Sequence, residues 1–264
     1  MEIIGNGFIA RHTRRFFGDR YPDVTLIAAG VSTVLVNDVS AFQRESALVY
    51  DVIHRCRAAG RTVIFLSTAS TGMYGADQSV GSEGGAVFPL TPYGRHKLCL
   101  EHVCALSGAR WLVLRLSHIV GPGQSPHQLL PSLTRQLLAG SVTLHSGVSR
   151  DLLDVGDMMR MLDSLLAQGV RDEVINVASG RSEAIEDIVD GLEERLGTRA
   201  ERKLVDMPAK RGHVRIEKLR GLVAGFDELG IGPGYLKSLL DRNIGELAES
   251  AHHDLAAESA VGRL

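Results

Sequence analysis

The sequence predicts an α/β fold with a Rossmann-like, doubly wound parallel sheet, and three observations support this prediction. Short apolar runs alternate with helical patterns along most of the 264 residues. The runs, such as Val24 to Ala29, are continuously apolar, which is typical of parallel strands covered on both faces. The first run, Met1 to Ile4, leads directly into a glycine-rich turn, Gly5 to Ala10, and then into a helical pattern, as in a nucleotide-binding βα unit.

The same patterns place the individual elements. The predicted strands are Met1 to Ile4, Val24 to Ala29, Thr62 to Ser67, Trp111 to Leu116, Val142 to His145 and Val174 to Val177. The predicted helices are Phe8 to Phe17, Ala41 to Ala59, Tyr93 to Ser107, Leu129 to Ala139, Asp157 to Ala167, Ile185 to Leu196, Glu217 to Leu222 and Gly234 to Ser250. Gly60 and Gly197 end two of these helices, and Pro92 precedes another, as glycine and proline commonly do.

Three segments have weak periodicity. Residues 75–92 form a glycine-rich loop that is either a lid or a surface connection. Residues 198–215 are polar and basic, which favours a solvated linker, with an anion-facing wall as the alternative. The tail from Ala251 is expected to be frayed. We therefore expect a truncated dinucleotide-binding domain over 1–120, a mainly substrate-binding lobe over 121–250 with strands returning to the sheet at about 150–180, and a tail over 251–264.

Composition narrows the class of protein. Hydrophobic residues make up 44% and charged residues 23%, and 29 basic against 31 acidic residues give a formal net charge of −2. No strong field or basic run favours nucleic acid or an anionic membrane, and we expect neither as a partner. No apolar stretch approaches the roughly 18 residues of a membrane span, and we expect no signal peptide. Three cysteines without metal-type spacing (Cys56, Cys99 and Cys104) suggest reduced thiols in a cytoplasmic protein without a metal site.

Tyr93 and Lys97 are the first candidates for chemistry. They stand at i and i+4, so both project from one helix face. A free tyrosine has a pKa near about 10. We expect the Lys97 ammonium to lower the pKa of Tyr93 and make it a general acid or base. For the pair alone, an exposed structural contact is the more common interpretation.

Ser70 follows the third strand, at the sheet edge where open α/β proteins bind ligands. Its hydroxyl is suited to hold a substrate oxygen beside Tyr93, and Thr68 and Thr71 compete for this role. The structural alternative is a turn-capping serine. The order of glycine turn, serine and Tyr-x-x-x-Lys pair favours hydride chemistry on an alcohol or ketone.

As an ordered set, these motifs resemble the extended short-chain dehydrogenase/reductases, in particular the NAD-dependent sugar-nucleotide epimerase/dehydratase group. Four stretches carry the resemblance, which extends to about residue 245: the turn from Gly7 to His12, the serine strand from Phe65 to Gly75, the helix start from Pro92 to Lys97, and the segment from Leu114 to Gln124.

The resemblance implies a set of roles. Tyr93 would exchange the proton of a sugar hydroxyl, Lys97 would hold the nicotinamide ribose and tune Tyr93, and Ser70 would orient the reacting oxygen. NAD or NADP would carry the hydride, because no side chain can. The cofactor-binding candidates are Gly5, Gly7, Phe8, Ile9, Ala10, Arg11, Ala28, Ala29, Gly30, Tyr93 and Lys97. The substrate-binding candidates are Thr71, His118 and Arg150, with Arg150 near the substrate diphosphate. The group also favours a homodimer.

The sequence departs from the family pattern in its first half. Only one strand lies between the glycine turn and the serine strand, and it resembles the family's fourth strand, so we expect the second and third to be missing. The first strand would then lie at the sheet edge. No carboxylate in Ala28 to Gly30 is available for the adenosine ribose, which predicts weak or atypical NAD(P) binding. Arg11 either meets a 2′-phosphate or faces solvent. Glu45 replaces the usual asparagine, and His118 stands where asparagine is expected.

Three functions remain open. The first is an NAD(P)-dependent epimerase or ketoreductase acting on a nucleotide-linked sugar. A 4,6-dehydratase is disfavoured because Thr71 and Gly72, not an acidic pair, follow Ser70. The second is a cofactor-poor relative that acts as a nucleotide-sugar-binding partner subunit, favoured by the departures above. The third is a non-redox acid/base isomerase that uses Tyr93.

Overall fold

A computed structural model of the chain describes residues 1–32, 36, 38–75, 81–210 and 213–261. Its main sheet is parallel and has the order β1-β2-β3-β4-β8. The strands are β1 (Glu2–Ile4), β2 (Val24–Ile27), β3 (Thr62–Thr68), β4 (Arg110–Leu116) and β8 (Glu173–Val177). Because all five run the same way, their carboxyl ends meet at one edge, which is where ligands bind in such sheets.

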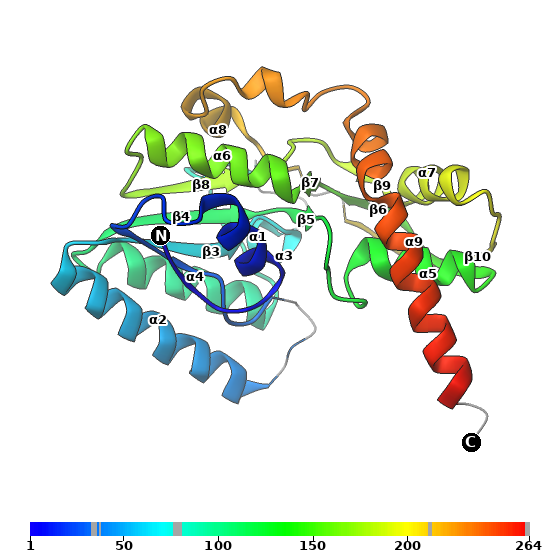
Figure 1. Cartoon of the computed structure of the whole chain (residues 1–264), viewed down its shortest axis with the longest axis horizontal. Coiled ribbons are helices and arrows are strands. Elements are labelled where there is room, and N and C mark those ends of the chain that lie inside the picture. Colours follow the sequence, from blue (N-terminus) through cyan, green and yellow to red (C-terminus); the bar gives the residue numbers. More distant parts are fainter. Residues whose placement is uncertain (33–35, 37, 76–80, 211–212, 262–264) are drawn as a thin grey trace.

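Helices cover both faces of this sheet (Figure 1). One face carries α2 (Val39–Ala59) and α4 (Pro92–Ala105), and the other carries α1 (Phe8–Phe17), α6 (Val155–Ala167) and α8 (Glu217–Leu222). Successive residues of β3 enter different cores: Val63 and Phe65 pack with α2 and α4, whereas Ile64 packs with the opposite layer. This alternation across a sheet buried on both faces explains the continuously apolar strand sequences.

A second group of elements lies beside the carboxyl edge of the sheet, at the right of Figure 1. Its sheet has the order β10-β6-β9, formed by β6 (Ser141–Arg150), β9 (Glu183–Ala184) and β10 (Glu201–Lys210). The helices α5 (Leu129–Leu138), α7 (Ile185–Leu196) and α9 (Tyr235–Val261) pack around it. A short parallel pair, β5 (His118–Val120) with β7 (Leu152–Asp154), lies between the two groups. The remaining elements are α3 (Thr71–Tyr74) and a 3₁₀ turn, η1 (Phe226–Leu229).

The first strand lies at the edge of the main sheet, as predicted. Among the described residues, β1 pairs only with β2, and α1 is joined to β2 by the short segment 18–23. In a full dinucleotide-binding sheet, two further strands stand on the other side of the first. Among the described residues, the main sheet is therefore built outward from β1 in one direction only.

Two sequence predictions differ from the structure in the second half. Residues 201–210, predicted as a linker, form strand β10, which pairs in parallel with β6. The strand pairs its backbone along β6, and Arg199 and Arg202 both form ion pairs with the buried carboxylate of Glu193. These two cations are therefore engaged by a carboxylate of α7.

The chain after Ala251, predicted to be frayed, continues α9 to Val261, while residues 262–264 lie outside the described part. Ala251 itself is buried, so packing extends the helix further than its polar composition suggested. The predicted loop over 75–92 is described from residue 81 onward. Its Gly81 carbonyl accepts hydrogen bonds from Asn176 and from the Arg215 backbone, which tie it to β8 and to the segment before α8.

A buried polar network holds the carboxyl edge together. The Arg115 guanidinium on β4 donates to both Glu101 oxygens on α4, with a shortest distance of 2.6 Å, and to the Tyr74 hydroxyl at 3.0 Å. Tyr74 in turn donates to Asn176 on β8 at 2.6 Å, and Ser67 on β3 donates to Glu101 at 2.5 Å. Because all these groups are buried, each charge depends on its partners.

We predict that Arg115→Met lowers the free energy of unfolding by about 3–5 kcal/mol, because it leaves the Glu101 carboxylate buried without its cation. Urea titration measures this change. The matched control is Arg44→Met, which breaks an exposed pair with Asp38 and is expected to cost less than about 1 kcal/mol. A loss for Arg115→Met as small as that of the control would contradict the role of the network.

Candidate active site

The glycine turn between β1 and α1 is shaped for close approach. Gly5 has a φ of +119°, and a Cβ added there would lie 2.4 Å from the Ala28 carbonyl oxygen, so the turn packs directly against the end of β2. Gly7 is the N-cap of α1, has no side-chain cap, and an added Cβ would meet nothing within 4 Å. The start of this ten-residue helix therefore offers backbone N–H groups and open space, which suits a diphosphate.

The other candidates of the turn lie around this opening. Phe8, Ile9 and Ala10 form the first turn of α1, and Ala28 to Gly30 follow β2 at the same sheet edge. Arg11 is exposed, yet its guanidinium donates to the carbonyls of Asn6 at 3.2 Å and Gly123 at 2.8 Å. These bonds make Arg11 a clamp between the glycine turn and the 121–124 loop.

Tyr93 and Lys97 face the interior from the start of α4. Thr91 caps this helix by accepting a hydrogen bond from the Gly94 N–H at 3.0 Å, which fixes where the helix begins. Both side chains are buried, and the Lys97 Nζ lies 5.8 Å from the centre of the Tyr93 ring. The helix thus delivers the pair to the carboxyl edge beside the end of β3.

Ser70 and Thr68 meet this pair from the end of β3. Thr68 forms a side-chain hydrogen bond with Tyr93. Its hydroxyl also donates to Ser70 at 3.0 Å, and Ser70 accepts a further bond from the Gly72 N–H at 3.2 Å. Ser70 therefore reaches Tyr93 through Thr68, the residue that the sequence offered only as a competitor. Thr71 begins α3 directly after Ser70.

The expectation that Lys97 lowers the pKa of Tyr93 is wrong for this structure. Burial and, after it, the negative charge of Glu45 raise the pKa of Tyr93 to about 12, while the Thr68 hydrogen bond acts against this change. The ammonium does not favour the phenolate because its charge is already compensated: Lys97 Nζ donates to Glu45 Oε1 at 2.6 Å. Burial lowers the pKa of Lys97, while Glu45 acts against this change.

Sequence reasoning noted Glu45 only as a departure and missed this contact. A signal was present, because Glu45 shares a helix face with the apolar Val49 and Val52 and is buried with them. A carboxylate on a buried helix face requires a partner. Its partners here are Lys97 and, at 3.0 Å, His96.

His118 and Arg150, two of the predicted substrate-binding residues, lie close together. His118 begins β5, and its backbone N–H donates to the Asp151 carbonyl at 3.0 Å, next to Arg150 at the end of β6. Burial, followed by the positive charge of Arg150, lowers the pKa of His118 to about 4. The imidazole is therefore neutral at pH 7. Arg150 donates to the Ser149 carbonyl at 2.8 Å.

Asp151 is a buried carboxylate that sequence reasoning did not single out. It accepts hydrogen bonds from the N–H and the hydroxyl of Ser179, both at 2.9 Å. Burial raises the pKa of Asp151 to about 6, and the hydrogen bonds from Ser179 act against this change. Asp151 directly follows β6, and Ser179 follows β8, so this contact joins the two sheets.

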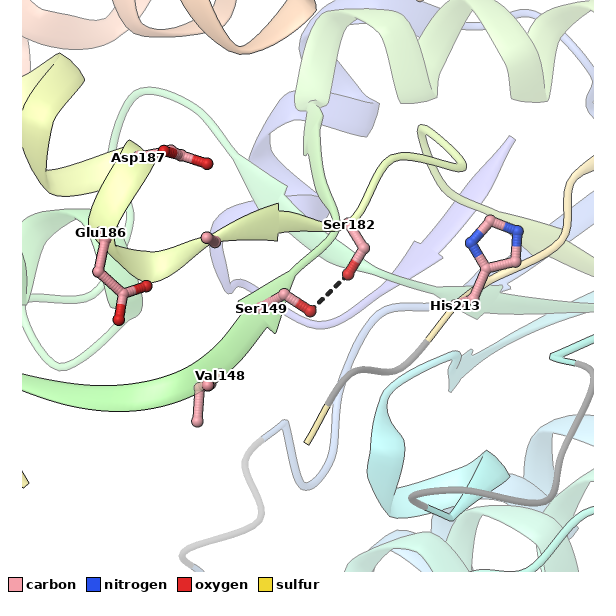
Figure 2. A pocket seen from close by; sticks show the side chains of 8 residues that line it. Val148, Ser149, Ser182, Glu186, Asp187 and His213 are labelled. Carbon is pink, nitrogen blue, oxygen red and sulfur yellow. Dashed lines mark hydrogen bonds between the residues drawn. The ribbon is translucent and has the colours of Figure 1, made fainter. Parts of the chain in front are cut away.

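A cavity of about 460 Å³ lies in the second group of elements, beside the sheet β10-β6-β9 (Figure 2). Its lining comes from β6, from the start of α7 and from the segment after β10: Gly147, Val148, Ser149, Ser182, Ala184, Glu186, Asp187 and His213. In Figure 2 the Ser149 and Ser182 hydroxyls point toward each other, 2.5 Å apart. Ser149, which lines the cavity, is the residue directly before Arg150, one of the predicted substrate-binding residues.

The chain belongs to the NAD dependent epimerase/dehydratase family, whose model matches residues 9–178. This confirms the family suggested by the motifs. The described residues contain no group of three or more metal-ligating side chains able to hold an ion, and no described helix is long and apolar enough to cross a membrane.

Two relatives illustrate the family. The chain is 28% identical over 186 residues to GDP-6-deoxy-D-mannose reductase of Pseudomonas aeruginosa, covering 65% of this chain and 60% of that protein. It is 27% identical over 173 residues to an uncharacterized UDP-glucose epimerase of Bacillus subtilis, covering 62% of this chain and 52% of that protein. The matched regions are thus little more than half the length of these curated relatives.

Solved structures share the fold. The protein RMD from Pseudomonas aeruginosa, solved with NADPH, has a TM-score of 0.78 at 21% identity and covers 94% of this chain and 98% of its own. The UDP-glucose 4-epimerase from Thermus thermophilus, solved with NAD, has a TM-score of 0.71 at 21% identity and covers 89% of this chain and 80% of its own. Both support the Rossmann-like assignment.

The pKa of His118 predicts a pH dependence of stability. Its value in the folded protein, about 4, lies below the roughly 6.5 of an unfolded chain, so the folded state disfavours the proton. The stabilising contribution is present above pH 6.5 and is lost as the pH falls toward 4, by at most about 3 kcal/mol. We expect His118→Gln to lose less stability than the wild type between pH 6.5 and 4.5 in urea titrations.

The control is His54→Gln, which alters an exposed histidine on α2. The contribution of Asp151 to stability depends on pH in the opposite direction. Its raised pKa gives a contribution that is present below pH 4 and is lost as the pH rises through 6. Comparing His118→Gln with the wild type at each pH separates the two effects. A constant difference between them from pH 4.5 to 7.5 would show that His118 is not buried in its neutral form.

Proposed function

We propose that the chain is an NAD(P)-dependent epimerase or ketoreductase that acts on a nucleotide-linked sugar through Ser70, Tyr93 and Lys97. The observation that carries this proposal is that Ser70, just after β3, is linked through Thr68 to Tyr93 on α4, with Lys97 one turn further along α4, at the carboxyl edge of a parallel sheet. Family membership and relatives that are named as a GDP-sugar reductase and a UDP-sugar epimerase support the same substrate class.

The residues fit a dinucleotide in part. The uncapped start of α1 at Gly7 suits the diphosphate, and Lys97 stands close to the reacting phenol for the nicotinamide ribose. After β2, by contrast, Ala28 to Gly30 supply no carboxylate for the adenosine ribose, and β1 has no second neighbour among the described strands. We therefore propose NAD or NADP binding that is weaker than in relatives with a full sheet.

Each side chain then has a defined task. Bound NAD(P) supplies the hydride chemistry that no side chain can provide. Tyr93 transfers the proton at the substrate oxygen, through its Oη. Thr68 and Ser70 hold that oxygen and the phenol in one hydrogen-bonded chain.

Substrate contacts are assigned to the second lobe. Arg150 meets the diphosphate of the nucleotide-linked sugar, and neutral His118 supplies a hydrogen bond beside it. The lobe over 121–250, with its cavity at Ser149 and Ser182, holds the rest of the substrate. A homodimer, as the family resemblance suggested, and a cytoplasmic location, as the cysteines suggested, complete the proposal.

Specific observations favour a second candidate. Lys97 is held by Glu45, and the adenosine side lacks its acid, as expected for a relative that binds a nucleotide-sugar as a partner subunit without a dinucleotide. Retention of Ser70, Tyr93 and Lys97 at one place opposes this alternative, because a binding module has no use for all three.

Cofactor binding is predicted to depend on Gly7. We expect calorimetry to detect NAD(H) or NADP(H) binding to the wild type and at least tenfold weaker binding to Gly7→Ala, because the added methyl stands where the diphosphate approaches. Stability of this variant should change by no more than about 1 kcal/mol, as its N-cap geometry allows alanine. If neither cofactor binds, with or without a UDP- or GDP-linked sugar, the partner-subunit candidate replaces the redox function.

Tyr93→Phe is predicted to reduce turnover by about 10²-fold or more while leaving the thermal transition unchanged, because it removes the transferable proton and little volume. Turnover is followed by NAD(P)H absorbance with nucleotide-linked sugars of the two classes above. Tyr50→Phe, which alters an exposed hydroxyl on α2, is the matched control and should be fully active. An active Tyr93→Phe enzyme would remove Tyr93 from the reaction.

A further inference from the structure

Glu45 is a buried carboxylate whose two oxygens are both engaged. Oε1 accepts a hydrogen bond from Lys97 Nζ at 2.6 Å. Oε2 accepts one from the Val31 backbone N–H at 3.1 Å and lies 3.0 Å from His96 Nε2. The Glu45 side chain is 0% exposed and that of Lys97 is 5% exposed, so water does not screen this ion pair.

The backbone beside Glu45 is adapted to this contact. Gly30 has a φ of +116°, and a Cβ added there would lie 2.3 Å from Glu45 Oε1. Any larger residue at position 30 would displace the carboxylate from Lys97. The chain after β2 is thus shaped around the Glu45 carboxylate, at a position first assigned to cofactor binding.

The donors of Lys97 are largely committed by these contacts. An ammonium has three N–H groups. One donates to Glu45 and a second to the Leu66 carbonyl at 3.2 Å, both within the described part of the chain. The Lys97 ammonium, which would otherwise stabilise a phenolate at Tyr93, is therefore neutralised by the Glu45 carboxylate from α2.

We propose that Glu45 is a positioning residue that compensates the charge of Lys97 and thereby keeps Tyr93 protonated at neutral pH, in the form that donates a proton during ketone reduction. This inference rests on the proposed function. During ketone reduction the Tyr93 O–H bond breaks and an O–H bond forms on the substrate oxygen. A reduced nicotinamide dinucleotide supplies the hydride to carbon and is itself oxidised, and water then reprotonates the phenolate.

The charged and titratable groups around Tyr93 all agree with this assignment. Glu45 approaches from α2, His96 and Lys97 share α4 with Tyr93, and Glu101 acts on Lys97 from the next turn. The Glu101 charge is itself paired with Arg115, so the carboxylate that compensates Lys97 is Glu45, which also bonds His96. The raised pKa of Tyr93 is consistent with this balance. Alcohol oxidation needs the phenolate form of Tyr93 as a base, and this balance of charges disfavours the phenolate.

The test follows the ionisation of Tyr93 without any cofactor. Ultraviolet absorbance of tyrosinate is titrated in the wild type and in Tyr93→Phe, and their difference reports Tyr93 alone. We expect no Tyr93 signal in the wild type below about pH 11. In Glu45→Gln the uncompensated ammonium should raise the acid dissociation constant of Tyr93 at least about tenfold, as measured against a Glu45→Gln/Tyr93→Phe reference.

A double variant keeps the test decisive if Glu45→Gln fails to fold. Glu45→Gln/Lys97→Met removes both buried charges together. If Glu45 compensates Lys97, Tyr93 should ionise at the same pH in the double variant as in the wild type, against a reference that also carries Tyr93→Phe. Ionisation at a clearly higher pH in the double variant would mean that Lys97 acts on Tyr93 uncompensated, and would overturn the inference.

The pH profile of alcohol oxidation supplies the second readout. Because oxidation needs the phenolate of Tyr93, its rate should rise with pH at a midpoint at least about one pH unit lower in Glu45→Gln than in the wild type, whereas Glu194→Gln on the exposed side of α7 should keep the wild-type midpoint. An unchanged Tyr93 ionisation in folded Glu45→Gln overturns the role of Glu45. A failure to bind NAD(P), by contrast, overturns the redox function, while the titration still reports the charge balance.

Discussion

Burial of charge at the carboxyl edge of the main sheet is the constraint on which the site depends. Two ion pairs lie there side by side on α4, Lys97 with Glu45 and Arg115 with Glu101. Each carboxylate reaches a cation on a different element, so the pairs fix α4 against α2 and β4. The geometry of Tyr93 is set by the same helix, and its chemistry is set by how completely these charges cancel.

The segment after β2 borders both ends of the proposed dinucleotide site. Among the described strands, β1 has no second neighbour that could bring an acid to the side of the glycine turn. Glu45 lies against Gly30 and reaches Lys97. The same segment after β2 thus leaves one end of the dinucleotide site unassisted and modifies the other.

The second lobe is joined to the site by residues that serve both parts. His118 begins β5 and contacts the backbone of Asp151, while Asp151 accepts hydrogen bonds from Ser179 after β8. Asn176 on β8 binds the loop at Gly81 and the segment at Arg215. The segment that carries His118 is therefore coupled to the main sheet by buried polar contacts.

Much of the fold was determined by the sequence alone. Continuous apolar runs gave the strands of the main sheet because both faces are buried, and the glycine turn, Ser70 and the Tyr93–Lys97 pair could be placed at its carboxyl edge because parallel strands end there together. Local pattern did not reveal β10 or the extension of α9, since their pairing and packing depend on residues distant in sequence. Local pattern also could not predict the pKa of Tyr93. An i, i+4 spacing identifies a neighbouring ammonium, but only the tertiary structure brings Glu45 across from α2 to cancel that ammonium, because electrostatic compensation depends on distance in space and on burial.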